Sequence, residues 1–239
     1  MRFSVVIPAH DEAGTIVGVV NEVISILGEA EFEIIVVDDG SSDGTGDLVA
    51  GHPSPRVRLV RHARQGGQSA AIHTGVRAAR YEIVCTLDGD GQSPPWHIAH
   101  MLAPFAGGDS RLGLVAGQVR TSGEGVGRPL VLLLANSLRS WVLGTRARDA
   151  GCGLKAFRRD AFLALPYFNG MHRYLPALFA RDGWTTCSVE VTERARTEGR
   201  SHYSTLLLAL VALIDLPGLL WLTRRAKRVA TSADPAEGG

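Results

Sequence analysis

The amino-acid sequence predicts an α/β fold, a Rossmann-like and mostly parallel sheet with helices on its faces. Short apolar runs and helix-like segments alternate regularly through the first hundred residues. Strands joined by helices need right-handed crossovers, so this alternation favours a parallel sheet. Carboxylates also follow directly after several of the apolar runs. Because ligands bind at the carboxyl edge of parallel strands, these carboxylates predict a binding site.

Size and composition limit the class of protein. The chain has 239 residues, of which 45% are hydrophobic, and this is enough for one large domain or two small ones. A net charge of +1 gives no case for bulk nucleic-acid binding. Cys85, Cys152 and Cys187 form no ligand pair and no disulfide framework, which favours a reduced, cytosolic setting. The chain opens on strand-like residues, without the pattern of a signal peptide.

The elements follow one another in a clear order. Strands are expected at Phe3–Ile7, Phe32–Val37, Val57–Val60, Ile83–Leu87 and Leu112–Ala116, and helices at Glu12–Leu27, Asp43–Val49, Ser69–Ala79 and after Pro94-Pro95. The pattern changes beyond Arg120. A glycine-containing loop is expected at Thr121–Gly127, an apolar helix at Leu130–Leu143, a loop and strand within Asp149–Phe157, and a late strand at Trp184–Val191.

The central feature is the stretch in which the run Ile83–Leu87 ends in Asp88-Gly89-Asp90. Strand alternation would place Asp88 and Asp90 on the same side, at the strand's carboxyl end. Two carboxylates so close repel each other unless a cation lies between them, and oxygen ligands suit Mg²⁺ or Mn²⁺. A solvated acidic turn is the alternative interpretation for any isolated pair of this kind.

Two other strand ends carry related residues. After the first strand come Pro8, His10, Asp11 and Glu12, where a histidine ring could stack on a base and a carboxylate could accept its N–H groups. Taken in isolation, this segment is better explained by acidic residues that favour a helix N-terminus. After the second strand come Asp38 and Asp39, while Asp43 is placed to cap the following helix. Like charges clustered at one sheet edge lower the stability of the fold. Binding of a nucleotide with a divalent cation would explain why carboxylates gather there.

These motifs together resemble family 2 glycosyltransferases of the GT-A fold, and in particular the polyprenyl-phosphate (dolichyl- or undecaprenyl-phosphate) sugar synthases. The matching segments run in the family's order from residue 5 to about 203: Pro8–Glu12, Asp38–Thr45, Gly67–Ala71, Asp88–Pro95, Gly151–Arg159 and Arg196–Tyr203. One such motif would be weak evidence, and six in sequence are strong evidence.

The resemblance implies roles for individual residues. Nucleotide binding is implied for Pro8, His10, Glu12, Asp38, Asp39, Gln68, Asp88 and Gly89. Catalytic roles are implied for Asp88, Asp90, Gln92, Arg120, Arg128 and Arg196, of which Asp88, Asp90 and Gln92 would form the site for Mg²⁺ or Mn²⁺ and the three arginines would contact phosphate. Surface charge is the alternative for each arginine.

Three positions depart from the family pattern. Asp11 stands where the family usually has Asn, and Gln65 stands where Asn commonly opens the Gly-Gln-Ser stretch. His202 replaces the usual Lys before Tyr203, which puts that phosphate contact in doubt. Other charged or ring-bearing side chains are expected to be structural or solvated: Lys155, Arg158, Arg159, Trp96, His97 and His100.

The acceptor is inferred from the chemistry of the nucleophile. Transfer to a sugar hydroxyl needs a general base, and the family's base motifs and its Gln-x-x-Arg-Trp motif are absent from the sequence. A lipid phosphate is ionised at neutral pH and needs no base, but it needs cations, for which arginine is well suited. The sequence therefore favours inverting transfer of a hexose from a UDP- or GDP-sugar to a polyprenyl phosphate.

Two further interpretations remain open. The same fold could transfer the sugar to a glycerolipid or soluble hydroxyl, which would require a carboxylate near the anomeric carbon. A protein of another class would be a non-catalytic nucleotide-sugar binding module, against which the intact Asp88, Asp90 and Gln92 argue. A nucleotidyltransferase would need a glycine-rich basic loop after the first strand, where this sequence is acidic.

The C-terminal region is expected to contact a membrane. Residues 1–203 are assigned to the catalytic domain, residues 204–228 to an apolar and basic segment, and residues 229–239 to a disordered tail. The apolar part is almost long enough to cross a bilayer, which takes about twenty residues. Asp215 and Pro217-Gly218 interrupt it, so two interfacial helices on the cytoplasmic face are favoured over a single span. A buried helical hairpin in a soluble protein is the third alternative.

Overall fold

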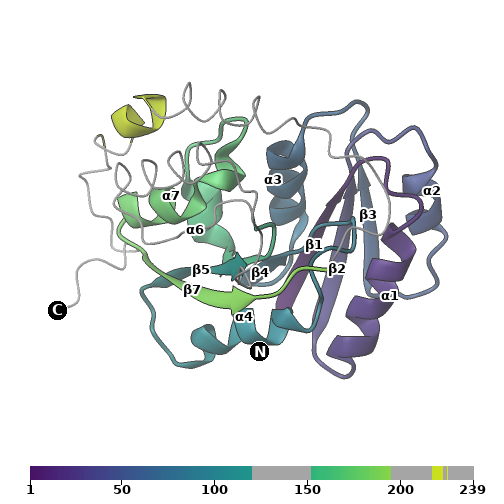
Figure 1. Cartoon of the computed structure of the whole chain (residues 1–239), viewed down its shortest axis with the longest axis horizontal. Helices are drawn as coiled ribbons and strands as arrows, with labels where there is room; N and C mark the ends of the chain where they lie inside the picture. Colours follow the sequence, from purple (N-terminus) through teal and green to yellow (C-terminus); the bar gives the residue numbers. More distant parts are fainter. Residues whose placement is uncertain (120–151, 195–216, 223–224, 226–239) are drawn as a thin grey trace, which may run out of the picture.

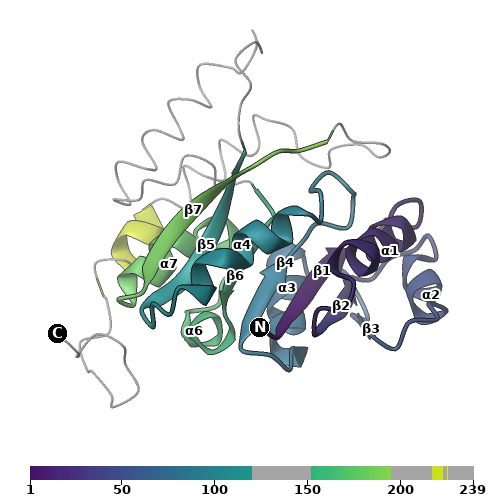
Figure 2. The ribbon, with the colours of Figure 1, turned by 90° about the horizontal axis from the view of Figure 1, so that it is seen from below.

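The computed structural model describes residues 1–119, 152–194, 217–222 and 225. Its centre is a seven-stranded sheet with the order β3-β2-β1-β4-β6-β5-β7, and Figure 2 shows these strands in succession from β3 at the right to β7 at the left. The strands are β1 (Phe3–Ala9), β2 (Phe32–Asp38), β3 (Val57–Arg61), β4 (Ile83–Thr86), β5 (Leu112–Val119), β6 (Lys155–Arg158) and β7 (Thr185–Val191).

Helices cover both faces of this sheet. They are α1 (Ile16–Leu27), α2 (Thr45–Ala50), α3 (Gln68–Ala78), α4 (His97–Ala106), α6 (Arg159–Ala164), the short 3-10 helix η1 (Met171–Arg173) and α7 (Leu175–Arg181). Figure 1 shows α3, α6 and α7 above the sheet and α4 below it. The result is the three-layer arrangement expected of alternating strands and helices.

The strand directions confirm the prediction of a mostly parallel sheet. Strand β1 lies parallel to β2 and β4, β2 lies parallel to β3, and β5 lies parallel to β7. Of the described strands, only β6 runs the other way, and it pairs antiparallel with both β4 and β5. The first four strands therefore end at the same edge of the sheet.

Strand alternation divides the buried side chains into two cores. In β1, Val5 and Ile7 point to the layer that holds α1 and α4, while Val6 points to the layer that holds α3, α6 and α7. All three side chains are fully buried. A strand with both faces covered has no need of polar alternation, which explains why the strands appear in the sequence as nearly continuous apolar runs.

The first helix begins later than predicted, at Ile16 instead of Glu12. Asp11 adopts a left-handed backbone with φ +53°, a conformation that Asp and Asn tolerate better than most residues. The amides of Glu12 and Ala13 donate to the side chains of Thr45, the first residue of α2, and of Asp43 in the loop before it. Because Asp and Asn both tolerate this conformation, Asp11 can stand where the family usually has Asn.

Strand β4 is shorter than predicted and ends at Thr86. Asp88 and Asp90 therefore lie in a turn beyond the strand, and the strand-alternation argument for their orientation does not apply. Leu87 still donates its amide to the carbonyl of Val6, at 3.0 Å, so the turn starts from a fixed point beside β1.

Several sequence predictions fall outside the described residues, including the helix at Leu130–Leu143 and most of the apolar segment 204–222. Residues 217–222 are helical, and Leu219 of this helix is buried in the core beside α7. Trp221 is exposed, and the Arg225 guanidinium lies 4.9 Å from its ring centroid. None of the helices in the described part of the chain is both long enough and apolar enough to span a bilayer.

Candidate functional site

A cleft of about 270 Å³ opens at the carboxyl ends of β1, β2 and β4. Residues from four separate chain segments line it: Pro8, Ala9, His10, Glu12, Asp39, Gln65, Gly67, Gln68, Ala71, Asp88, Gly89 and Asp90. Eight of these were predicted from the sequence as site residues. The parallel sheet thus brings together motifs that are up to eighty residues apart in the chain.

The carboxylates of Asp88 and Asp90 form the acidic end of the cleft. Gln68 donates its side-chain amide to Asp88 at 3.0 Å, and the backbone N–H of Gln92 donates to Asp90 at 3.0 Å. Burial and, after it, the negative charge of Asp90 raise the pKa of Asp88 to about 6. Glu193 and Glu12 act in the same direction. The site therefore holds more negative charge than its surroundings neutralise.

Lys155 of β6 partly offsets this charge. Its side chain is only 4% exposed, its ammonium donates to the carbonyl of Cys152, and its positive charge opposes the rise in the pKa of Asp88. The sequence-based expectation that Lys155 belongs to a solvated face is therefore wrong. The apolar pattern of a four-residue strand was too short to show that the first residue of β6 points inward.

Gly153 allows β6 to approach the acidic end of the cleft. A Cβ atom at this position would lie 1.8 Å from an oxygen of Asp88, which no side chain could occupy. Thr86 helps to fix the same segment, because its hydroxyl donates to the carbonyl of Gly153 at 2.6 Å. The Gly-x-Lys spacing thus places a glycine against Asp88 and a buried cation beside it.

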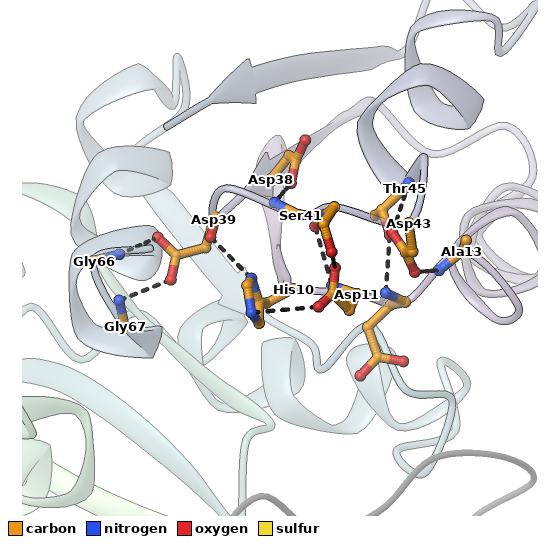
Figure 3. A network of polar contacts seen from close by, with 12 residues as sticks. His10, Asp11, Ala13, Asp38, Asp39, Ser41, Asp43, Thr45, Gly66 and Gly67 are labelled. Atoms are coloured by element: carbon orange, nitrogen blue, oxygen red, sulfur yellow. Dashed lines mark hydrogen bonds and ion pairs between the residues drawn. The ribbon is translucent and has the colours of Figure 1, made fainter. Parts of the chain in front are cut away.

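The loop after β1 forms the opposite part of the cleft. The His10 ring lies 3.0 Å from the carbonyl oxygen of Asp39, so its Nδ1 hydrogen faces that acceptor (Figure 3). Glu12 accepts a hydrogen bond from the Thr15 hydroxyl, which also donates to the carbonyl of Gly89. Through Thr15, the first loop and the Asp88–Asp90 turn are held together.

The two aspartates after β2 have different environments. One oxygen of Asp38 accepts the Ser41 amide at 2.9 Å, and the other faces Gly46, where a Cβ would lie 2.1 Å away. Asp38 lies outside the set of residues that line the cleft. Asp39 does line the cleft, but its carboxylate points to the amides of Gly66 and Gly67 (Figure 3).

Asp43 has the structural role that the sequence indicated. Its carboxylate accepts the amide of Ala13 and both the amide and the hydroxyl of Thr45 (Figure 3). Burial by itself would raise the pKa of Asp43, but the hydrogen bonds from Thr45 and Ala13 hold it below its ordinary value. This carboxylate joins the loops that follow β1 and β2.

His97, at the start of α4, also has a structural role. The Nε2 atom of His97 is 2.9 Å from the Thr192 hydroxyl, and burial lowers the pKa of His97. Gln92 does not line the cleft, although its backbone joins Asp90 to Arg194. Arg120, Arg128, Arg196 and His202 lie outside the described residues.

A divalent cation is compatible with this chemistry, although the protein contributes few ligands. Within the described part of the chain, no three His, Cys, Asp or Glu side chains converge on one point. Asp88 and Asp90 provide two carboxylates. Burial and the charge of Asp90 raise the pKa of Asp88. Mg²⁺ is commonly held by one or two carboxylates together with substrate phosphate and water, so this pair fits such an ion.

Sequence reasoning did not assign three groups at this site: Ala9, Gln65, Gly67 and Ala71 of the cleft lining, Gly153 and Lys155 beside Asp88, and Glu193 after β7. Gly153 and Lys155 lie in the segment Gly151–Arg159, which matched the family in the sequence analysis. That match was the signal that could have identified them as site residues. Glu193 carried none, because its approach to Asp88 depends on how β7 pairs with β5.

Curated proteins of similar sequence act on polyprenyl phosphates, according to their names. The dodecaprenyl-phosphate galacturonate synthase of Rhizobium johnstonii is 29% identical over 95% of this chain and 69% of its own length. The undecaprenyl-phosphate 4-deoxy-4-formamido-L-arabinose transferase of Pectobacterium carotovorum is 30% identical over 86% of this chain. The alignment covers 63% of that second relative, so this chain spans only part of its length.

Solved structures with the same fold share less sequence. The glucosyl-3-phosphoglycerate synthase of Mycobacterium tuberculosis, crystallised with Mn²⁺, UDP-glucose and phosphoglyceric acid, matches with a TM-score of 0.73 and 23% identity over 92% of this chain and 80% of that one. The mannosyl-3-phosphoglycerate synthase of Rubrobacter xylanophilus matches with a TM-score of 0.72 and 17% identity over 98% and 79%. These likenesses confirm the predicted fold.

The family assignment rests on the part of the chain that builds the cleft. The profile of glycosyl transferase family 2 matches residues 4–165, which include β1 to β6 and every residue that lines the cleft. This match covers more than half of the sequence, and the chain is a glycosyltransferase that belongs to glycosyl transferase family 2.

Proposed function

We propose that this protein transfers a hexose from a nucleotide diphosphate sugar to a polyprenyl phosphate, with inversion and with Mg²⁺ or Mn²⁺. The observation that carries the proposal is the Asp88–Asp90 pair at the end of a cleft whose other wall is formed by the loops after β1 and β2. The charge of this pair matches a cation bound to a diphosphate, and the remaining cleft is left for the nucleoside and sugar.

The polyprenyl-phosphate acceptor is supported by two independent lines of argument. The curated relatives are named for dodecaprenyl and undecaprenyl phosphates. A phosphate oxygen is already ionised at neutral pH and attacks without a general base, which agrees with the absence of the family's base motifs from the sequence. Arg120, Arg128 and Arg196 are the residues proposed to hold the phosphate groups.

The metal would be held by Asp88 and Asp90, with Gln92 supporting the turn through its backbone. A bound cation would neutralise charge on the departing diphosphate, which is the main electrostatic requirement of the reaction. The protein's own contribution is to keep the two carboxylates together. Gln68 donates to Asp88, and the positive charge of Lys155 lowers its pKa.

The decisive experiment combines radiolabelled UDP- and GDP-sugars with undecaprenyl phosphate and Mn²⁺, and measures label in the organic phase. We expect label there with wild-type protein and none in excess EDTA. Label that appears only in a water-soluble product, when a soluble hydroxyl acceptor is supplied, would establish the alternative acceptor. Tight nucleotide-sugar binding without any transfer would establish a binding module instead.

A further inference from the structure

The carboxylate of Asp39 accepts three hydrogen bonds from groups of the protein. One oxygen accepts the amide of Gly66 at 2.8 Å and lies 2.6 Å from Nδ1 of His62, and the other accepts the amide of Gly67 at 2.7 Å. Asp39 itself is only 3% exposed. Figure 3 shows this side chain directed toward the two glycines, on the side away from Asp11. We call Asp39, His62, Gly66 and Gly67 the Asp39 cluster.

His62 connects this cluster to three elements of the fold. It follows β3 directly, and its amide donates to the carbonyl of Asp38 at 2.9 Å. Because Nδ1 faces a carboxylate, it carries a hydrogen and donates it. On the other side of the ring, Nε2 lies 2.9 Å from the hydroxyl of Thr74 in α3. The ring thus fixes β2, β3 and α3 relative to one another.

The loop held by this cluster is a wall of the cleft. Gln65, Gly67 and the next residue, Gln68, all line the cleft. The loop also packs closely on Gly40, where a Cβ would lie 2.7 Å from the backbone of Arg64 and Gln65. Since Gly40 has φ +72°, no other residue would be accommodated there easily. The position of the wall therefore depends on Asp39 and Gly40 behind it.

We propose that His62 is a positioning residue for the donor nucleotide, which it serves by holding Asp39 as the acceptor for the Gly66 and Gly67 amides. The wall held in this way then presents Gln65 and Gly67 to the nucleoside. This inference rests on the proposed function and goes beyond it by assigning His62.

The order Asp39, His62, Thr74 matches that of a nucleophilic triad, but its surroundings do not. Among the described residues that line the cleft, neither His62 nor Thr74 appears. A hydroxyl outside the cleft does not meet the substrate, so the hydrogen-bonded series serves to hold the wall.

Two substitutions at one position separate the two sides of the ring. His62→Asn keeps a donor near the position of Nδ1 and therefore the contact with Asp39, whereas His62→Gln places its amide toward Thr74 and loses that contact. We expect His62→Gln to raise the Kd for UDP or GDP and the KM for the nucleotide sugar by about fivefold to tenfold, with kcat within about twofold. His62→Asn should restore most of the affinity.

The matched control is His52→Gln, the same change at a half-buried histidine just after α2, hydrogen-bonded to Asn21. It should leave both constants unchanged. Hydrogen exchange at the Gly66 and Gly67 amides gives a readout independent of activity: exchange should accelerate in His62→Gln and stay slow in His62→Asn. Thermal melting of each variant shows whether it is folded, and His62→Asn tests the proposal should His62→Gln fail to fold.

The outcomes distinguish this inference from the proposed function. Wild-type affinity and slow glycine exchange in a folded His62→Gln would overturn the role of His62 while leaving the transferase intact. A fall in affinity that His62→Asn does not restore would also overturn it. Wild-type protein that binds neither UDP nor GDP, as measured by calorimetry, would overturn the proposed function and this inference together.

Discussion

Single residues at the acidic end of the cleft are held in place by the backbone around them. Asp90 accepts the Gln92 amide, and Asp88 lies between a glutamine amide and the backbone of Gly153. Their roles are therefore separable by substitution: one carboxylate can be removed while its surroundings remain, or the surroundings can be changed while both carboxylates remain.

We expect Asp90→Ala to abolish transfer and to leave the fold largely intact. The side chain makes a hydrogen bond to its own turn, whose loss costs about 1 kcal/mol in the free energy of unfolding. Loss of one of two metal-binding carboxylates would remove transfer altogether. Organic-phase label and a thermal melt measure the two effects. Asp47→Ala, at a carboxylate whose side chain is 82% exposed, is the control and should remain active. An active Asp90→Ala protein would contradict the assignment.

Gly153→Ala should impair both activity and stability. The added Cβ would lie 1.8 Å from an oxygen of Asp88, so either β6 or the Asp88 turn must move. We expect a loss in the free energy of unfolding of about 1–3 kcal/mol, typical of overpacking, and a large loss of transfer. Chemical denaturation measures the first effect.

Gly18→Ala is the matched control for that prediction. Gly18 lies on the exposed side of α1, and no atom lies within 4 Å of the position that an added methyl group would take. An alanine in a helix interior stabilises by about 0.5–1 kcal/mol relative to glycine. If both substitutions were equally well tolerated, the close contact between Gly153 and Asp88 would not be a constraint in solution.

At the scale of elements, the apolar runs predicted the central strands β1, β2 and β4 well because these strands are buried on both faces. The start of helix α1 was predicted less accurately, and it lies where the loops after β1 and β2 contact each other through side chains. Helix α1 starts at Ile16, and the amides of Glu12 and Ala13 before it donate to the side chains of Thr45 and Asp43. Such contacts connect β1 and β2 through their loops, and no local pattern in the sequence announces them.

The late strands show a second limit. Strand β6 runs antiparallel between β4 and β5, although it comes after both in the sequence. Its four residues are too few to show a period, so neither its direction nor the inward position of Lys155 could be predicted. Six motifs in the family's order nevertheless identified most of the cleft, because residues at the carboxyl edge of a parallel sheet converge whatever the length of the intervening helices.

Helix η1 and helix α3 are joined by a buried histidine that should make stability depend on pH. The Nδ1 atom of His172 lies 2.7 Å from the Ser69 hydroxyl, and burial, with the charges of Lys155 and Arg173, lowers the pKa of His172 to about 3. Between about pH 6.5 and that value the unfolded chain binds a proton that the folded chain excludes. The stability contributed by neutral His172 is therefore present above about pH 6.5 and is lost as the pH falls.

His172→Gln should make the free energy of unfolding less dependent on pH. For one such group, the slope is at most about 1.4 kcal/mol per pH unit. Chemical denaturation of wild type and variant between about pH 6.5 and about pH 5 gives the difference in slope, and His52→Gln serves as the control. Parallel stability curves for wild type and His172→Gln would show that His172 takes up its proton in the folded state.

At the scale of the whole molecule, the C-terminal region is tied to the catalytic domain. Leu219 is 3% exposed and packs in the core that contains α7, and Arg181 of α7 donates to the carbonyl of Arg225. Truncation after Tyr203 would therefore remove a core contact as well as any membrane contact. Substitution of exposed side chains is the cleaner way to test where this region lies.

We expect the protein to dock on the cytoplasmic membrane surface through Trp221 and the basic residues at 224–228. The Trp221 ring is 58% exposed, Arg225 stacks on it, and the sequence adds Arg224, Lys227 and Arg228. An aromatic ring beside basic side chains suits the interface between acyl chains and anionic headgroups, where each Lys or Arg contributes about 1 kcal/mol. A lipid-phosphate acceptor would hold its phosphate at the same level.

Sedimentation with vesicles tests this expectation. Wild-type protein should sediment with anionic vesicles at low salt, and much less with neutral vesicles or at high salt, because exposed charges are screened. Trp221→Ala should weaken binding, and changing the four basic residues to Gln should weaken it further. Leu48→Ala, at an exposed apolar residue of α2, is the control and should bind normally. A C-terminal tag found on the outer face of the membrane would instead establish a span, and full-length protein that never sediments would leave the apolar segment as part of the folded core.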